Sequence, residues 1–278
     1  VGSCTDLVAT VMQPMIRLFD KKFSVAPYGV ILKPSHGRRI LSGKKRAGFS
    51  PKAAYIFKKQ LEEADFLILN RIDELEPQEV RDLQQLLEAE TPGAPVLRRS
   101  AKTGDGFQAL VEMLDKQGLF GQRILDLDYD VYAEGEAELG WLNSSIRVSA
   151  DSPFALDDVL LGIVTRLKSM LAEVDAETAH LKTIGLWEGF HGVANLVSSD
   201  TEPELSLPSS CITKLADVVV NARVATNPEL LRELVERAVR EACDASGATP
   251  DFRQTQSFRP GRPVPTHRYS QAYEGKDS

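Results

Sequence analysis

Polar side chains directly follow a short apolar run in the stretch FLILNRIDEL, residues 66–75. The apolar run predicts a buried strand, and Asn70, Arg71 and Asp73 come just after it. A carboxylate at a strand end can accept two hydrogen bonds side by side, and guanine offers two parallel donors, N1–H and the N2 amine. Adenine lacks this pair. We therefore expect Asp73 to read guanine, Asn70 to tie this loop to its neighbour, and the aliphatic stem of Arg71 to cover one face of the base.

Two readings of this tetrapeptide stay open on the residues alone. Asp73 precedes a predicted helix that begins near Pro77, so it could instead be a helix cap. A second polar loop favours base recognition over the cap. The sequence SAKTG, residues 100–104, follows the next short predicted strand at residues 95–99. Ligands of parallel sheets bind beyond the carboxyl ends of the strands, where both loops are expected. For SAKTG itself, the alternative is an ordinary turn with a serine cap and a glycine.

The elements that must position these loops alternate between strand and helix. This alternation predicts a parallel sheet with flanking helices, an α/β fold. Before it, residues 5–20 predict a helix kinked at Pro14, and the basic residues 35–46 predict a mobile, solvated loop, or alternatively a docking site for an acidic partner. The predicted elements are strands at 25–33, 66–69 and 95–99 and helices at 51–64, 77–90 and from 107 to Gly118.

The second half of the chain predicts a smaller α+β domain. We expect residues 1–121 to form the first domain, 122–139 an acidic linker, 140–245 the α+β domain, and 246–278 an irregular tail. The predicted elements of the second domain are a strand at 141–148, a helix capped by Ser152 with Pro153 as its first residue, strands at 180–187, 192–198 and 216–225, and a helix capped by Asn227 that reaches Cys243.

Composition excludes several classes of function. The chain has 278 residues, 42% hydrophobic and 26% charged, as is typical of globular proteins. Its net charge of −7 argues against a partner with a phosphate backbone, such as nucleic acid. No apolar run approaches the roughly 20 residues of a membrane helix. An odd number of scattered cysteines, 3, favours a reducing compartment, so we expect a cytoplasmic protein.

The two loops support a resemblance to a known family. NRIDEL resembles the NKxD element of P-loop GTPases, with Arg71 in place of the usual lysine. QLEEADFLILNRIDEL as a whole resembles the CobW-type (cobalamin-synthesis-type) metallochaperone GTPases, and the α+β half is similar to the CobW C-terminal domain. The opening VGSCTDL resembles the segment after the Walker B aspartate, in which Gly2 would be the switch-region glycine.

The resemblance implies roles for further residues. The backbone N–H of Ala101 would donate to guanine O6, the stem of Lys102 would cover the ring opposite Arg71, and Ser100 would hydrogen-bond within its loop. The implied ligand is GTP with Mg²⁺ in the complete protein. A transition metal such as zinc or cobalt would be the cargo, and a client metalloprotein the partner.

One motif that this chemistry needs is not in the sequence. The chain has no GxxxxGK[ST] phosphate-binding loop, and SGKK at residues 42–45 lacks the spacing. The family's Cys-x-Cys-Cys metal motif is also missing, as is the glutamate expected before Val1. We therefore expect an N-terminally truncated chain that needs a missing segment or partner chain, has no catalytic residue of its own and does not hydrolyse GTP alone. The alternative is a non-enzymatic interaction module.

No metal site is expected among the histidines and cysteines. None of the histidines forms HxxxH or stands near a cysteine, and the cysteines form no CxxC pair. His180 and His191 flank a predicted hairpin and could approach each other. The residues concerned are His36, His180, His191, His267, Cys4, Cys211 and Cys243.

Overall fold

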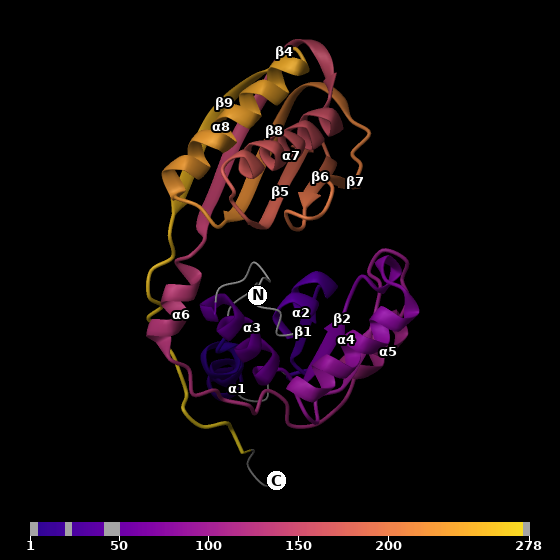
Figure 1. Ribbon diagram of the computed structural model, residues 1–278, viewed down its shortest axis with the longest axis vertical. Coiled ribbons are helices and arrows are strands. Elements are labelled where there is room, and N and C mark those ends of the chain that lie inside the picture. Colours follow the sequence, from indigo (N-terminus) through magenta and orange to yellow (C-terminus); the bar gives the residue numbers. More distant parts are fainter. Residues whose placement is uncertain (1–4, 20–23, 42–50, 275–278) are drawn as a thin grey trace. The chain divides into compact units, whose positions relative to one another are not determined.

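Two compact units make up the chain in the computed structural model, which describes residues 5–19, 24–41 and 51–274. Unit 1 comprises Val1–Gly135 together with Arg262–Ser278, and unit 2 comprises Glu136–Gly261. Unit 1 holds a parallel sheet with helices, and unit 2 holds an antiparallel sheet with helices (Figure 1). The predicted fold class, α/β followed by α+β, is confirmed. Among the described helices, none is both long enough and apolar enough to span a membrane.

The sheet of unit 1 has three parallel strands, β1 (Gly29–Leu32), β2 (Phe66–Leu69) and β3 (Val96–Arg98), with β2 in the centre. In this register Leu69, the last residue of β2, lies opposite Leu32 on one side and Arg98 on the other. The alternation of strands and helices in the sequence is thus confirmed. Because neighbouring parallel strands end together, the loops after β2 and β3 begin side by side.

The central strand β2 is buried along its whole length because both faces of the sheet are covered. Successive side chains point to opposite faces. Leu67 and Leu69 pack in a cluster with α3 and α4, whereas Phe66 and Ile68 pack against α5. This explains a continuous apolar run instead of an alternating one. The helices concerned are α3 (Pro51–Glu63), α4 (Pro77–Glu90) and α5 (Phe107–Leu114).

Three segments of unit 1 differ from the sequence predictions. Helix α2 (Pro34–Leu41) replaces the first part of the predicted loop; Pro34 starts it, and Gly37 lets it approach closely, since a Cβ there would lie 3.0 Å from side chains of Leu32 and Leu83. Residues 42–50 lie outside the described residues. Helix α6 (Tyr129–Glu136) lies in the predicted linker, because Tyr132 is buried in a cluster with α3.

The first helix of unit 1 is not a single α-helix. It starts as a π-helical turn, η1 (Val8–Met12), and continues as α1 (Gln13–Phe19). The change falls just before Pro14, whose missing N–H removes one α-helical hydrogen bond. The predicted irregularity at this proline is therefore a π turn.

Unit 2 contains a six-stranded antiparallel sheet of order β7-β6-β5-β8-β4-β9. The order strand, helix, two strands, helix, strand is that of the split βαβ arrangement, and the β6–β7 hairpin extends the sheet beyond β5. The predicted strands near 141, 180, 192 and 216 are confirmed. The strands are β4 (Gly140–Ala155), β5 (Thr178–Trp187), β6 (Phe190–Leu196), β7 (Glu204–Leu207), β8 (Ile212–Val224) and β9 (Thr249–Phe258).

Helices α7 (Leu156–Glu173) and α8 (Pro228–Ala245) supply the apolar residues that form the core of unit 2 with the sheet. Asn227 caps α8 as predicted, because its Oδ1 accepts from the N–H groups of Glu229 and Leu230. The predicted start of α7 at Pro153 is wrong. Strand β4 continues to Ala155 because Phe154 is buried and pairs with Thr213 of β8.

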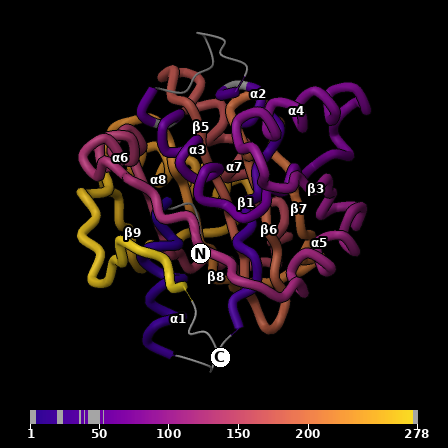
Figure 2. The backbone as a smooth tube through the Cα atoms, turned by 90° about the horizontal axis from the view of Figure 1, so that it is seen from below, coloured from indigo at the N-terminus to yellow at the C-terminus, as the bar shows by residue number. Residues whose placement is uncertain are grey.

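The predicted irregular tail is also wrong in its first part. Residues Thr249–Phe258 form β9, which pairs with β4 along most of its length. The strand is polar and half exposed, so its sequence lacks the apolar pattern that would predict it. After β9 the chain joins unit 1, where the yellow C-terminal segment passes α6 (Figure 2).

Candidate functional site

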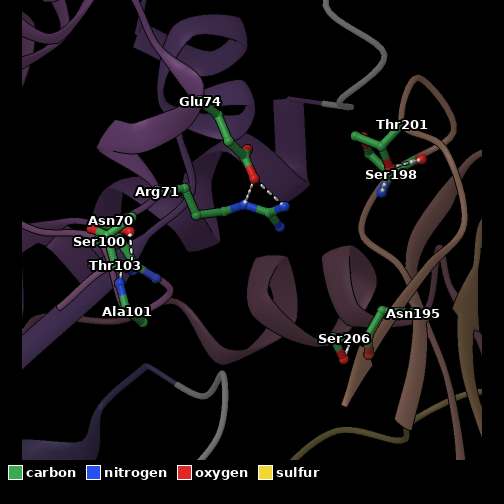
Figure 3. A network of polar contacts seen from close by, with 10 residues as sticks. All are labelled: Asn70, Arg71, Glu74, Ser100, Ala101, Thr103, Asn195, Ser198, Thr201 and Ser206. Carbon is green, nitrogen blue, oxygen red and sulfur yellow. Dashed lines mark hydrogen bonds and ion pairs between the residues drawn. The ribbon is translucent and has the colours of Figure 1, made fainter. Parts of the chain in front are cut away.

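The loops after β2 and β3 are joined by hydrogen bonds. The backbone N–H of Arg99 donates to Leu69 O at 2.9 Å, and that of Ile72 donates to Arg99 O at 3.3 Å. Asn70 Oδ1 then accepts the N–H of Ala101 at 3.0 Å (Figure 3). This is the loop-to-loop link expected of Asn70. It also means that a guanine O6 would have to share the Ala101 donor with Asn70.

Asp73 lies in a short 3₁₀ turn, η2 (Ile72–Glu74), and its side chain is exposed. A hydrogen bond from the buried Ser100 hydroxyl lowers the pKa of Asp73, and the charges of Lys102 and Arg71 lower it further. The carboxylate is therefore ionised at neutral pH, as an acceptor of two guanine donors must be.

The helix-cap alternative for Asp73 is wrong. Helix α4 begins at Pro77, and its N-cap is Glu76. Glu76 and Glu79 form a reciprocal capping box, in which Glu79 Oε2 accepts the Glu76 N–H at 3.0 Å. Asp73 is not needed for the start of this helix, so its carboxylate is available for another role.

The SAKTG loop is closed by bonds around Ser100. Its Oγ accepts the N–H of Thr103 at 3.1 Å, and its carbonyl accepts the N–H of Gly104 at 3.0 Å. The Ser100 N–H in turn donates to Asp105 O at 3.0 Å, and the Thr103 hydroxyl donates to the Asp105 carboxylate at 2.7 Å. Ser100 therefore bonds within its loop and also contacts Asp73, while Lys102 is exposed on the loop surface.

Gly106 and Gly104 provide a matched pair of variants for this loop. Both have positive φ, 73° and 86°, but a Cβ at Gly106 would lie 2.0 Å from Arg98 O, whereas nothing lies within 4 Å at Gly104. We expect Gly104→Ala to cost about 1 kcal/mol for its backbone conformation. Gly106→Ala should cost at least about 1 kcal/mol more, because the loop must move away from β3. Urea unfolding measures both; equal losses would contradict the close approach.

Arg71 has its charged end on Glu74. Its Nε and Nη2 lie 2.8 and 2.5 Å from Glu74 Oε1, and its backbone is left-handed with φ of 64°. In Figure 3 the side chain extends towards Glu74, and Asn70, Ser100 and Ala101 lie together on the other side of the Arg71 Cα. The structure thus brings together Asn70, Asp73, Ser100 and Ala101. Gly2 lies outside the described residues.

The histidines and cysteines form no centre in the described residues, where no group of three metal-ligating side chains occurs. The register of β5 and β6 places His180 and His191 near opposite ends of the hairpin, so they do not approach each other. Cys211 and Cys243 are buried. Burial raises the pKa of Cys243 to about 12, which keeps it a thiol.

A buried polar cluster in unit 1 was not predicted from the sequence. Glu63 is fully buried on α3 and accepts the Val8 N–H at 2.6 Å, and its Oε2 has no hydrogen-bond partner. Asp6 is 2% exposed and is bound by Arg268 and by the Tyr129 hydroxyl. No local pattern distinguishes Glu63 from the exposed Glu62 beside it, so the sequence gave no signal.

Comparison with known proteins yields two structural matches of low similarity. The Zn(II)-bound YjiA GTPase from E. coli matches with 15% identity and a TM-score of 0.28, over 82% of this chain and 66% of that chain. A triple mutant of the same GTPase matches with 16% identity and a TM-score of 0.27, over 85% and 66%. The chain thus spans just under two thirds of their length. No family model and no curated protein matches the sequence.

Proposed function

We propose that unit 1 recognises a guanine nucleotide through the loops after β2 and β3. The observation that carries the proposal is the ionised Asp73 carboxylate, held by Ser100 beside the Asn70–Ala101 bond. It would accept guanine N1–H and N2–H together, while Ala101 N–H faces O6. Adenine would place a lone pair at the carboxylate. Such a mismatch costs several kcal/mol, roughly a 10⁴-fold loss of affinity.

The resemblance extends this proposal to GTP-driven metal delivery by a CobW-type protein. There the bound Mg²⁺ and phosphates supply charge stabilisation for hydrolysis. The sequence contains no phosphate-binding loop to hold them, so we assign this chain base recognition without a hydrolytic step. Zinc or cobalt as cargo and a metalloprotein client belong to the complete protein. The missing GxxxxGK[ST] equally favours a second candidate, a non-enzymatic module that retains the fold.

NMR titration tests base recognition directly in this chain, because it detects weak binding. Guanosine monophosphate at millimolar concentration should shift the amide signals of Ala101 and Asp73, and adenosine monophosphate should not. Equal shifts with both nucleotides, or none with either, would refute guanine recognition. Phosphate release from GTP and Mg²⁺ separates the two candidates: turnover by the isolated chain would show that it holds the phosphates after all.

A further inference from the structure

The C-terminal segment of unit 1, residues 262–274, lies along its first helix. The backbone N–H of Tyr269 donates to Ala9 O at 3.1 Å, and that of Tyr273 donates to Gln13 Oε1 at 2.7 Å. Arg17 donates to Gln271 O at 2.8 Å. The helix positions 9, 13 and 17 are four residues apart, so they share one face of η1–α1. The segment thus binds one side of this helix over two turns.

Aromatic rings strengthen this contact at the end of the helix. The Arg17 guanidinium lies 4.6 Å from the ring centre of Tyr269 and 5.9 Å from that of Tyr273. Both rings belong to the C-terminal segment, so one arginine of α1 contacts it through two rings and a carbonyl. These contacts join residues more than 250 positions apart in the sequence.

An ion pair fixes the same segment at the start of the helix. Arg268 Nε lies 2.8 Å from Asp6 Oδ2, and Arg268 Nη2 also donates to Leu125 O at 2.9 Å. The Asp6 side chain is 3% exposed and that of Arg268 is 28% exposed. The Tyr129 hydroxyl of α6 donates to the same carboxylate. A buried ion pair loses much more than a surface pair when one partner is removed.

We propose that residues 262–274 form a latch, closed by the Asp6–Arg268 ion pair, that holds η1–α1 in place and releases it as one unit when it opens. Three observations support a single device: the contacts follow one helix face, they include both ends of the helix, and the segment has no helix or strand of its own. The latch starts four residues after Phe258, the end of β9. The edge strand of unit 2 is therefore joined to it by only a short stretch of chain.

Hydrogen exchange of the full chain without nucleotide tests the latch independently of the proposed function. In Arg268→Gln, amides of residues 7–19 and 269–274 should exchange faster together, by at least about tenfold, while α4 amides keep their rate. Arg262→Gln is the matched control. Arg262 lies on the same segment but pairs with Asp130 at the surface, with 56% and 77% exposure, so it should leave both rates unchanged.

A second variant guards against general unfolding of Arg268→Gln. Arg17→Gln acts from the helix side, outside the buried ion pair, and should accelerate the same two stretches by a smaller factor. The latch is refuted if either variant accelerates only one of the stretches, if Arg262→Gln matches Arg268→Gln, or if α4 amides accelerate equally in both variants.

Discussion

Asp73→Asn reverses the base preference from guanine to xanthine. An amide cannot accept both N1–H and N2–H of guanine, but it can donate to the C2 carbonyl that xanthine has in place of the amine. The change removes one matched pair and creates another, so the ratio of affinities should shift by up to roughly 10⁴. Competition between guanosine and xanthosine monophosphates, followed by the amide signal of Ala101, measures its direction in this chain.

Asp82→Asn serves as the control for this reversal. Asp82 is an exposed carboxylate on α4 that accepts from Gln78 at 2.6 Å, and it lies outside both loops. It removes the same charge from unit 1 without touching the candidate site. Its base preference should equal that of the unmodified chain. If Asp73→Asn also keeps the original preference, Asp73 does not read the base.

Glu63→Gln removes most of the pH dependence of unit 1 stability between pH 5 and 8. Burial raises the pKa of Glu63 from its ordinary value of 4.5 to about 7, although the Val8 N–H opposes this rise. Protonated Glu63 therefore favours the folded state. Its contribution is fully present below about pH 4.5 and is lost as the pH rises through 7. A difference of this size corresponds to about 3 kcal/mol.

Urea titrations at pH 5 and 8 measure this loss. Methyl signals of Leu67 and Leu69 report on unit 1, because both tryptophans, Trp141 and Trp187, lie in unit 2. Glu62→Gln is the matched control, since Glu62 is exposed and pairs with Lys59 at 2.8 Å. It should keep the pH dependence of the unmodified chain. A Glu63→Gln variant with the same pH dependence would show that another group titrates.

The candidate site could be predicted because its signals are local. An apolar run followed by NRID, and a second strand followed by SAKTG, each describe a strand end, and parallel pairing then places the two ends together. The alternative role of Asp73 as a cap could not be decided in this way. It depended on whether Glu76 and Glu79 form the capping box of α4, which only their positions in three dimensions show.

The wrong predictions concern segments whose structure depends on distant residues. Helix α2 reads as a basic loop, but Gly37 lets it pack against Leu32 and Leu83. Strand β9 reads as a polar tail, but it completes its hydrogen bonds with β4, some 110 residues earlier in the chain. Backbone donors and acceptors must find partners wherever the fold supplies them, and a polar edge strand carries no apolar pattern to announce this.

By itself, the sequence determined the two fold classes, the strand ends and the residues placed at them, because apolar periodicity and turn residues act over a few positions. Only the tertiary structure decided that Ser100 holds Asp73, that Glu63 is buried with a raised pKa, and that Arg268 returns to Asp6. The burial of a charge and its partner is a property of what packs around it. For Asp6 that partner lies 262 residues away.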